Sequence, residues 1–196
     1  MNKNQLPFWP NNEYYFITTS TFLHFPYFNT FEKKKLVLDK FEEIEERLNI
    51  KLIAYSIAIN HFHYFAFLND GLLYSKTKQL LNGGVSHQYK KTFQCKYQEM
   101  WQSTKAFVIK DEDSFWRVIG YINGNLLKHK EVSTFNELRE CQFFSHIKFV
   151  KEYGEEAAKD LVYRVIDVNE DGEGNVDFNK LNQIGVKDVF RKIKGD

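Results

Sequence analysis

LIAYSIAI (Leu52–Ile59) and FHYFAFL (Phe62–Leu68) are two runs of mostly β-forming residues that follow one another almost without a break. Only Asn60 and His61 part them, so the sequence predicts two neighbouring strands, either as a tight hairpin or as one bent pair. The segments directly before and after these two runs have the spacing of apolar residues that is typical of helices instead of strands. Their order along the chain indicates the fold class.

A third strand and a helix precede this pair. Tyr14–Ser20 is rich in β-forming residues and predicts a strand. From Phe31 to Leu48 the apolar residues recur three and four positions apart among many charges, which predicts an amphipathic helix. The residues that define this spacing are Val37, Phe41, Ile44 and Leu48.

The segments after the pair repeat this alternation. Leu72–Phe93 predicts a mainly helical segment that Gly83 and Gly84 weaken, and Ala106–Ile109 predicts a strand. Acidic residues at 111–113 suit the N-terminus of a further helix. The order strand, helix, strand, strand, helix, strand, helix predicts an α+β protein with a ferredoxin-like β-α-β-β-α-β sheet and an additional C-terminal helix.

Length and composition indicate one main domain with two appendages. The chain has 196 residues, 43% hydrophobic and 27% charged, which excludes a disordered chain or a fibrous repeat. We divide it into a polar N-terminal arm (1–12), a main domain (13–130) and an irregular, acidic C-terminal extension (131–196). Cys95 and Cys141 lack disulfide or metal spacing, and no apolar run is long enough to span a bilayer, so we expect a cytoplasmic protein.

The middle of the chain is basic and rich in aromatic residues. Residues 72–130 carry 10 basic and 4 acidic side chains, while the net charge of the whole chain is only +1. Cations for phosphates and rings for base stacking suit a single-stranded nucleic acid, although a solvated helix face over an aromatic core gives the same pattern. The candidate DNA contacts are Lys90, Lys91, Lys105, Arg117 and Lys128.

A histidine pair lies at the start of the second run. On a strand, residues two positions apart project from the same face, so His61 and His63 lie together while Phe62 enters the opposite face. Neutral imidazoles are common ligands of divalent metals. Two ligands do not complete a site, and two satisfied histidines near a core fit the pattern as well.

The surrounding sequence resembles a known signature. In the IS200-like, REP-associated tyrosine transposases, which are HUH endonucleases, a hydrophobic strand ends in Pro-Asn-His-hydrophobic-His. The run from Leu52 to Phe65 is similar to it and keeps the asparagine and both histidines. Ile59 stands where the family usually has proline.

A second motif agrees with the first in order and spacing. The family has a Trp-Gln pair ahead of a strand and then a helix containing Tyr-Ile-x-x-Asn. Here Trp101–Gln102 is followed by YINGN at Tyr121–Asn125. Leu126 replaces the usual proline, so we expect the helix to continue. The resemblance extends over roughly residues 13 to 150.

The resemblance implies a reaction and a site. Tyr121 and Asn125 lie one turn apart on one helix face, with His129 a turn further on. By resemblance, the additional helix is catalytic, Tyr121 is the nucleophile, and Asn125 is the third ligand, beside His61 and His63, of Mg²⁺ or Mn²⁺, with catalytic zinc left open. The implied activity is a transposase that cleaves single-stranded DNA through a 5′-phosphotyrosine intermediate, transfers the strand and recognises DNA hairpins, as a monomer or a homodimer.

Two other functions stay open at this point. One is a domesticated DNA-binding protein that keeps the fold and no longer cleaves. The other is an unrelated metal-dependent hydrolase that uses water as its nucleophile. A calcium loop beginning at Asp167 is disfavoured, because its twelfth position is Phe178 instead of glutamate, and an acidic turn is expected there.

Overall fold

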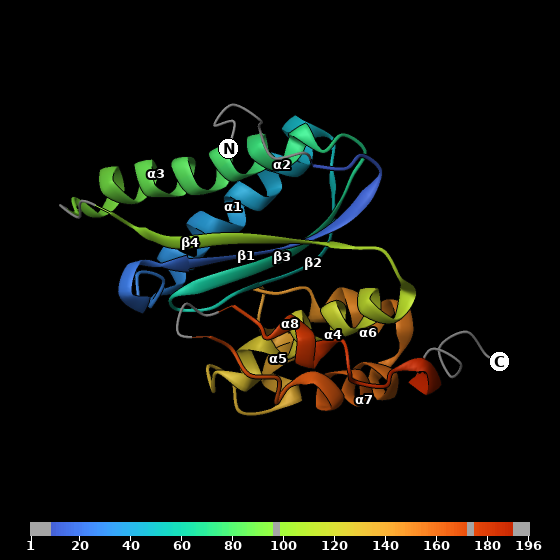
Figure 1. The fold of residues 1–196 in the computed structure, drawn as a ribbon. Helices are drawn as coiled ribbons and strands as arrows, with labels where there is room; N and C mark the ends of the chain where they lie inside the picture. Colours follow the sequence, from blue (N-terminus) through green and yellow to red (C-terminus); the bar gives the residue numbers. More distant parts are fainter. Residues whose placement is uncertain (1–8, 96–98, 172–174, 190–196) are drawn as a thin grey trace.

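One antiparallel sheet forms the middle layer of the protein. The computed structural model describes residues 9–95, 99–171 and 175–189. The strands lie in the order β2-β3-β1-β4, with helices on both faces (Figure 1). They are β1 (Glu13–Thr21), β2 (Lys51–Ile57), β3 (His61–Leu68) and β4 (Trp101–Ile109). The predicted α+β class with a β-α-β-β-α-β unit is confirmed.

One helical layer is formed by the connections between the strands. Thr30 caps the first helix by accepting a hydrogen bond from the Lys33 amide, and the apolar stripe of that helix is buried as its period predicts. The π-helical segment η2 begins directly after α2 and ends at Gly83, which is where the sequence predicts a weak point. The elements of this layer are η1 (Phe22–His24), α1 (Phe31–Leu48), α2 (Leu72–Lys78), η2 (Gln79–Gly83) and α3 (Gly84–Phe93).

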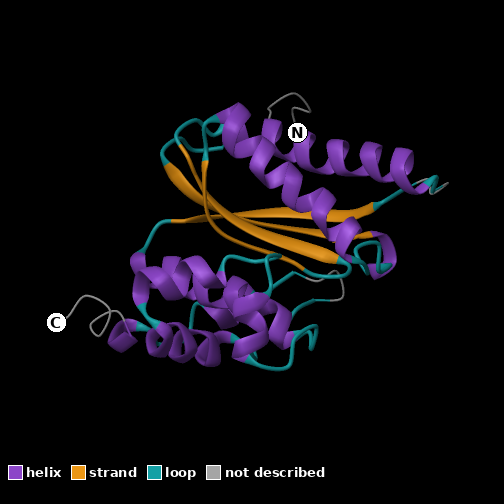
Figure 2. Ribbon diagram, turned by 180° about the vertical axis from the view of Figure 1, so that it is seen from behind, coloured by secondary structure: helices purple, strands orange, loops and turns teal. Residues whose placement is uncertain are grey.

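The other helical layer contains the C-terminal part of the chain, as Figure 2 shows from behind. The region beyond residue 131, which the sequence predicts to be irregular, contains four helices among its described residues. These helices are short, so each shows too few turns for a clear period. None of the described helices is long and apolar enough to cross a membrane. The helices are α4 (Glu112–Lys128), α5 (Phe135–Glu140), α6 (His146–Tyr153), α7 (Glu155–Val165) and α8 (Phe178–Leu181).

The two faces of the sheet have separate cores. Phe62 and Tyr64 of β3 pack with Phe41 of α1, at ring-centroid distances of 5.7 and 5.6 Å. Phe65 belongs to the core that includes α4 and α7. Alternate residues of β3 therefore face different helical layers, as expected for a strand buried on both sides.

The structure decides between the two alternatives for β2 and β3 and corrects the predicted start of β4. β2 and β3 form an antiparallel hairpin, closed by the Ala58 amide donating to the His61 carbonyl at 2.9 Å, so the hairpin alternative holds and His61 begins the strand. β4 begins at Trp101, five residues before the predicted start. Its polar residues Ser103 and Thr104 pair with Ser20 and Thr19 of β1 through side-chain hydrogen bonds, which hydrophobic patterning does not reveal.

Candidate functional site

His61 and His63 lie buried between the sheet and α4. They are 2% and 0% exposed, and their ring centroids are 4.9 Å apart. Phe62 enters the opposite core, as the strand period predicts. The His63 ring is 5.3 Å from the Tyr121 ring, so α4 brings the second motif against the first. The structure thereby joins two segments that are far apart in the sequence.

Hydrogen bonds fix the orientation of both imidazoles. The Nδ1 of His61 lies 2.8 Å from Asn60 Oδ1, and because that oxygen only accepts, Nδ1 carries the proton and Nε2 keeps its lone pair. The Nδ1 of His63 shares a hydrogen bond with the Thr18 hydroxyl at 2.9 Å. Neither Nε2 has a hydrogen-bond partner among the described residues. Each ring therefore keeps one unsatisfied nitrogen inside the protein.

Burial keeps both imidazoles neutral. It lowers the pKa of His61 to about 3, with a further contribution from His129. Burial, and then the neighbouring His61 ring, lower the pKa of His63 well below its ordinary value. Neutral imidazole is the form that binds a metal.

α4 places Tyr121 and Asn125 opposite the histidines. Its first turn is capped by Asp111, which accepts a hydrogen bond from the Ser114 amide. Without proline after Asn125, the helix runs on to Lys128, as predicted. Asn125 lies one turn after Tyr121 on α4 and is 0% exposed, yet both polar atoms of its amide lack a hydrogen-bond partner within the described part of the chain.

The Tyr121 hydroxyl is closed off by a residue of the C-terminal region. Its side chain is 1% exposed, and the hydroxyl donates a hydrogen bond to Glu170. The Lys128 ammonium lies 4.9 Å from the centroid of the Tyr121 ring and donates to Glu170 Oε1 at 2.8 Å. Burial and then the negative charge of Glu170 raise the pKa of Tyr121 well above its ordinary value. In this arrangement the phenol is protonated and inaccessible.

Two residues at the site, His129 and Glu170, were not among the metal ligands expected from the sequence. One donor atom each of His61, His129 and Glu170 lie within 4.8 Å of one another, so these residues form a potential metal-binding group. His129 is visible in the sequence as the residue one turn beyond Asn125. Glu170 has no such signal, because it lies in the acidic segment that resembles a calcium loop. Residues 172–174 of that loop lie outside the described residues, and Asp171 accepts hydrogen bonds from Asn175 within the turn.

The donor set fits a divalent cation. Unsatisfied buried nitrogen and oxygen atoms cost free energy unless a partner is supplied, and here they converge from β3 and α4. Imidazole nitrogen, amide oxygen and carboxylate oxygen suit Mg²⁺, Mn²⁺ or zinc with positions left for a substrate.

The five candidate DNA-contacting residues do not form one surface. Arg117 is buried, and its guanidinium donates to the Ile184 carbonyl and pairs with Asp113, so it does not present its charge to a ligand. Lys128 lies in the site beside Tyr121. Lys105 projects from β4 and pairs with Asp171 at 3.1 Å. The remaining two, Lys90 and Lys91, are exposed at the end of α3.

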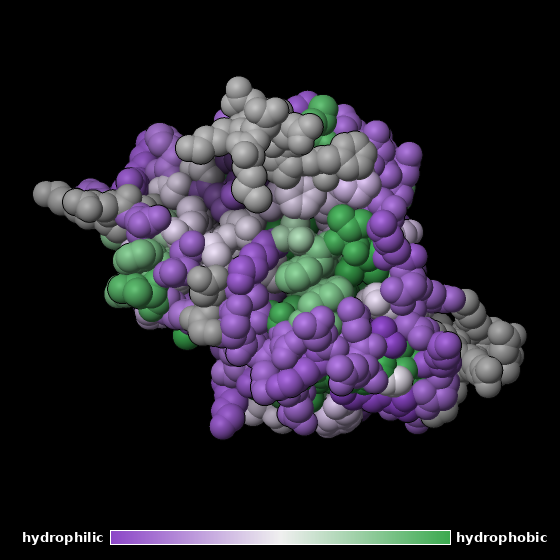
Figure 3. All heavy atoms as spheres, in the orientation of Figure 1, coloured by the Kyte–Doolittle hydropathy of each residue, from purple (hydrophilic) through white to green (hydrophobic). Residues whose placement is uncertain are grey.

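A groove runs between the edge strand β4 and the helices α2 and η2. Its volume is about 840 Å³, and its walls carry both rings and amino groups. Figure 3 shows apolar side chains in the middle of this face, where β4 runs in Figure 1, with hydrophilic residues around them. The lining includes Trp9, Tyr74, Lys78, Lys105 and Phe107.

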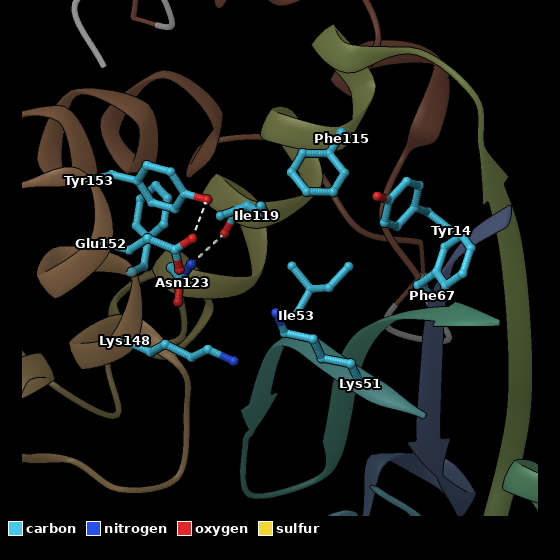
Figure 4. A pocket seen from close by; sticks show the side chains of 11 residues that line it. Tyr14, Lys51, Ile53, Phe67, Phe115, Ile119, Asn123, Lys148, Glu152 and Tyr153 are labelled. Carbon is cyan, nitrogen blue, oxygen red and sulfur yellow. Dashed lines mark hydrogen bonds between the residues drawn. The ribbon is translucent and has the colours of Figure 1, made fainter. Parts of the chain in front are cut away.

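A second cavity lies far from the histidines. It is about 340 Å³ and opens between the sheet and the helices α4 and α6 (Figure 4). Tyr14 and Phe67 line it and pair with each other across β1 and β3, whereas His61 pairs with Ser20. Along the strands this place is six residues from His61 and four from His63, roughly 20 and 13 Å at 3.3 Å per residue. This cavity is therefore not part of the histidine site.

Comparison with known proteins identifies the family of the chain and its fold. A family model described as "Transposase IS200 like" matches residues 12–125. A solved structure described as a REP-associated tyrosine transposase bound to a REP hairpin is 15% identical, with a TM-score of 0.60, covering 89% of this chain and 98% of that one. A putative transposase from Deinococcus radiodurans R1 is also 15% identical, with a TM-score of 0.44, covering 62% of this chain and 95% of that one. No curated protein matches the sequence.

Proposed function

Because this chain belongs to the IS200-like transposase family, we propose that it is a metal-dependent endonuclease and strand transferase acting on single-stranded DNA. Tyr121 is the nucleophile, and His61, His63 and Asn125 hold the cation, Mg²⁺ or Mn²⁺. The substrate is a DNA hairpin with a flanking single strand. A solved structure with the same fold is bound to a hairpin, which supports this choice of substrate.

The observation that carries this proposal is that the histidine motif on β3 and the tyrosine motif on α4 lie against each other. Two buried imidazole nitrogens and one buried amide have no partner among the described residues. The His63 ring lies 5.3 Å from the buried Tyr121 ring, and Asn125 lies one turn after Tyr121 on α4. Chance packing would satisfy such groups or replace them by apolar side chains. Their arrangement supports a site built for a charged ligand.

The residues of the chain perform distinct parts of the reaction. A bound divalent cation supplies charge neutralisation at a phosphodiester. The Tyr121 oxygen forms a bond to phosphorus while the bond to the 3′ oxygen breaks, which leaves a 5′-phosphotyrosine and a free 3′-hydroxyl. The reverse attack by another 3′-hydroxyl joins the strands. Asn60 and Thr18 hold the imidazoles in the required orientation.

Cleavage requires the contact between Tyr121 and Glu170 to break. With 1% of its side chain exposed and its hydroxyl bonded to a carboxylate, Tyr121 cannot reach a phosphodiester in the conformation described. This same observation favours a second candidate function, a DNA-binding protein of the same fold that does not cleave. The two candidates differ in one measurable product, the covalent adduct.

DNA would bind where cations and rings occur together. The groove along β4 offers Lys78 and Lys105 beside Trp9 and Tyr74, which suits phosphates and stacked bases. Lys90 and Lys91 are exposed at the end of α3 and remain separate candidate contacts, because they do not line this groove. We leave Arg117 out of this surface because its guanidinium is buried.

The deciding experiment looks for the adduct. The protein is incubated with Mn²⁺ and labelled single-stranded hairpin oligonucleotides from its own genomic flanks, then denatured and separated by size. We expect a denaturation-resistant adduct that Tyr121→Phe removes without loss of DNA binding. Tyr163→Phe is the matched control, because that tyrosine is 62% exposed on α7 and should leave the adduct unchanged.

Other outcomes identify the rival functions. Salt-sensitive binding without an adduct would favour the non-cleaving DNA-binding protein. Cleavage that survives in Tyr121→Phe would mean that water is the nucleophile and that the tyrosine assignment is wrong.

A further inference from the structure

Glu170 reaches the site from outside the part of the chain that the family model matches. That match ends at residue 125, and Glu170 lies between α7 and α8. Its side chain is only 12% exposed. Its Oε1 accepts hydrogen bonds from Tyr121 and from Lys128, the latter at 2.8 Å, and lies 3.3 Å from His129 Nε2. One carboxylate oxygen of Glu170 therefore lies next to polar groups of Tyr121, Lys128 and His129.

The space between Glu170 and His61 is bordered by lone pairs from both sides. The Nε2 of His61 carries a lone pair and lacks a hydrogen-bond partner in the described residues, although the residue is only 2% exposed. The Glu170 carboxylate offers lone pairs to the same space. Two sets of lone pairs repel each other, whereas a cation between them satisfies both.

The separations suit one ion. One donor atom each of His61, His129 and Glu170 lie within 4.8 Å of one another. Metal–ligand bonds of about 2.0–2.3 Å place ligand atoms on opposite sides of one ion about 4–4.6 Å apart. Small side-chain shifts are enough to bring the three atoms onto a single cation.

We propose that Glu170 and His129 are cation ligands of this protein, which act together with His61 on the cation that its proposed function requires. The C-terminal region then supplies a carboxylate to the site. An oxygen bound to a cation is a weaker acceptor for the Tyr121 hydroxyl, and the cation repels the Lys128 ammonium. Cation binding would therefore loosen the contact that closes off the nucleophile. The inference rests on the proposed function in one respect: the cation bound by these residues is the one that cleavage requires.

The test measures Mn²⁺ binding to the full-length protein without DNA. Electron paramagnetic resonance counts free Mn²⁺ in a titration of the wild type, Glu170→Gln and His129→Gln. We expect each variant to bind Mn²⁺ at least about 10-fold more weakly, since loss even of groups that only support a ligand costs about 10- to 100-fold in affinity. Glutamine keeps the size of the glutamate and one acceptor oxygen for Tyr121 and Lys128, so the fold should be retained.

Matched controls separate a ligand from a structural contact. Asp167→Asn removes an exposed carboxylate of the same segment and should leave Mn²⁺ affinity unchanged within twofold. His61→Ala shows that the measured ion binds at this site. Glu170→Asp, which keeps the carboxylate, should recover part of the affinity. Thermal unfolding without metal confirms that each variant is folded.

The possible failures are distinguishable. If Mn²⁺ binding depends on His61 but is equal in wild type and Glu170→Gln, the inference is overturned while the proposed function stands. If Glu170→Gln weakens Mn²⁺ binding but wild type forms no DNA adduct, the metal site stands and the proposed function fails. Absence of Mn²⁺ binding to the wild type would overturn the inference.

Discussion

Asn60 determines which nitrogen of His61 is free. Its Oδ1 accepts the Nδ1 proton, and its amide also donates to the His24 carbonyl at 3.3 Å, so the side chain is itself held in place. A ligand whose ring can rotate or change tautomer binds a metal less tightly. The asparagine of the NHFH motif thus has a physical role that is separate from direct ligation.

Asn60→Ala should weaken Mn²⁺ binding by about 10-fold or more, because the His61 ring loses its orientation. Asn60→Asp keeps an acceptor and should lose less. Isothermal titration with Mn²⁺ measures both. Asn69→Ala, an exposed asparagine at the other end of β3, is the control. Equal affinity in Asn60→Ala and the control would remove Asn60 from the site.

The helix α4 depends on two glycines for its contact with α7. A Cβ on Gly120 would lie 2.7 Å from Leu161 Cγ and 3.0 Å from the Leu161 carbonyl oxygen, and one on Gly124 would lie 2.7 Å from Val162 Cγ1. Glycine in a helix costs about 1 kcal/mol relative to alanine. Close helix packing is the reason for accepting this cost, so these glycines serve the contact between α4 and α7.

Gly120→Ala should lower the free energy of unfolding by about 1–3 kcal/mol, because the methyl group overpacks the contact between α4 and α7. Gly83→Ala is the matched control, since a methyl group added there would meet nothing within 4 Å and the φ of Gly83 is −66°. It should be neutral or stabilise by up to about 1 kcal/mol. Urea denaturation compares the two. A stable Gly120→Ala protein would contradict the proposed packing.

The C-terminal region shares one core with the sheet. Phe16 and Phe65 of the sheet, Ile119 of α4 and Leu161 of α7 belong to a single buried cluster. Removal of the region after residue 130 would expose the apolar face of α4 to water. The 131–196 extension, whatever its part in function, contributes to the stability of the molecule.

A protein truncated after residue 130 should therefore aggregate or unfold at temperatures where the full chain is stable. Size-exclusion chromatography and thermal unfolding of both proteins test this. A soluble, monomeric truncated protein with a similar melting temperature would show that the sheet and α4 form an independent domain.

Acid should destabilise the whole molecule through buried histidines. Burial lowers the pKa of His146 to about 4, because the ring lies between Phe144 and Phe135, at centroid distances of 5.5 and 5.8 Å. The unfolded chain binds a proton at a pKa of about 6.5, so protonation favours unfolding below that pH. The stabilisation is fully present above about pH 6.5 and is lost as the pH falls towards 4.

Urea unfolding at a series of pH values, with a chelator present, measures this loss. His146→Leu should reduce the fall in the free energy of unfolding between pH 7 and pH 4. His87→Leu, on the exposed side of α3, is the control and should leave the fall unchanged. An identical pH profile in His146→Leu and wild type would contradict the role given to His146.

The sequence alone determined the element order, the pairing of His61 with His63 on one face, and the spacing of Tyr121 and Asn125, because each depends on a period within a few residues. The family resemblance implied that Tyr121 and Asn125 share a site with the histidines, whereas only the tertiary structure showed how α4 packs there and brought in Glu170, which lies 49 residues from Tyr121. It also buried Arg117, which the sequence placed among the DNA contacts. Contacts across such separations arise from packing between layers, and no local pattern of residue types encodes them.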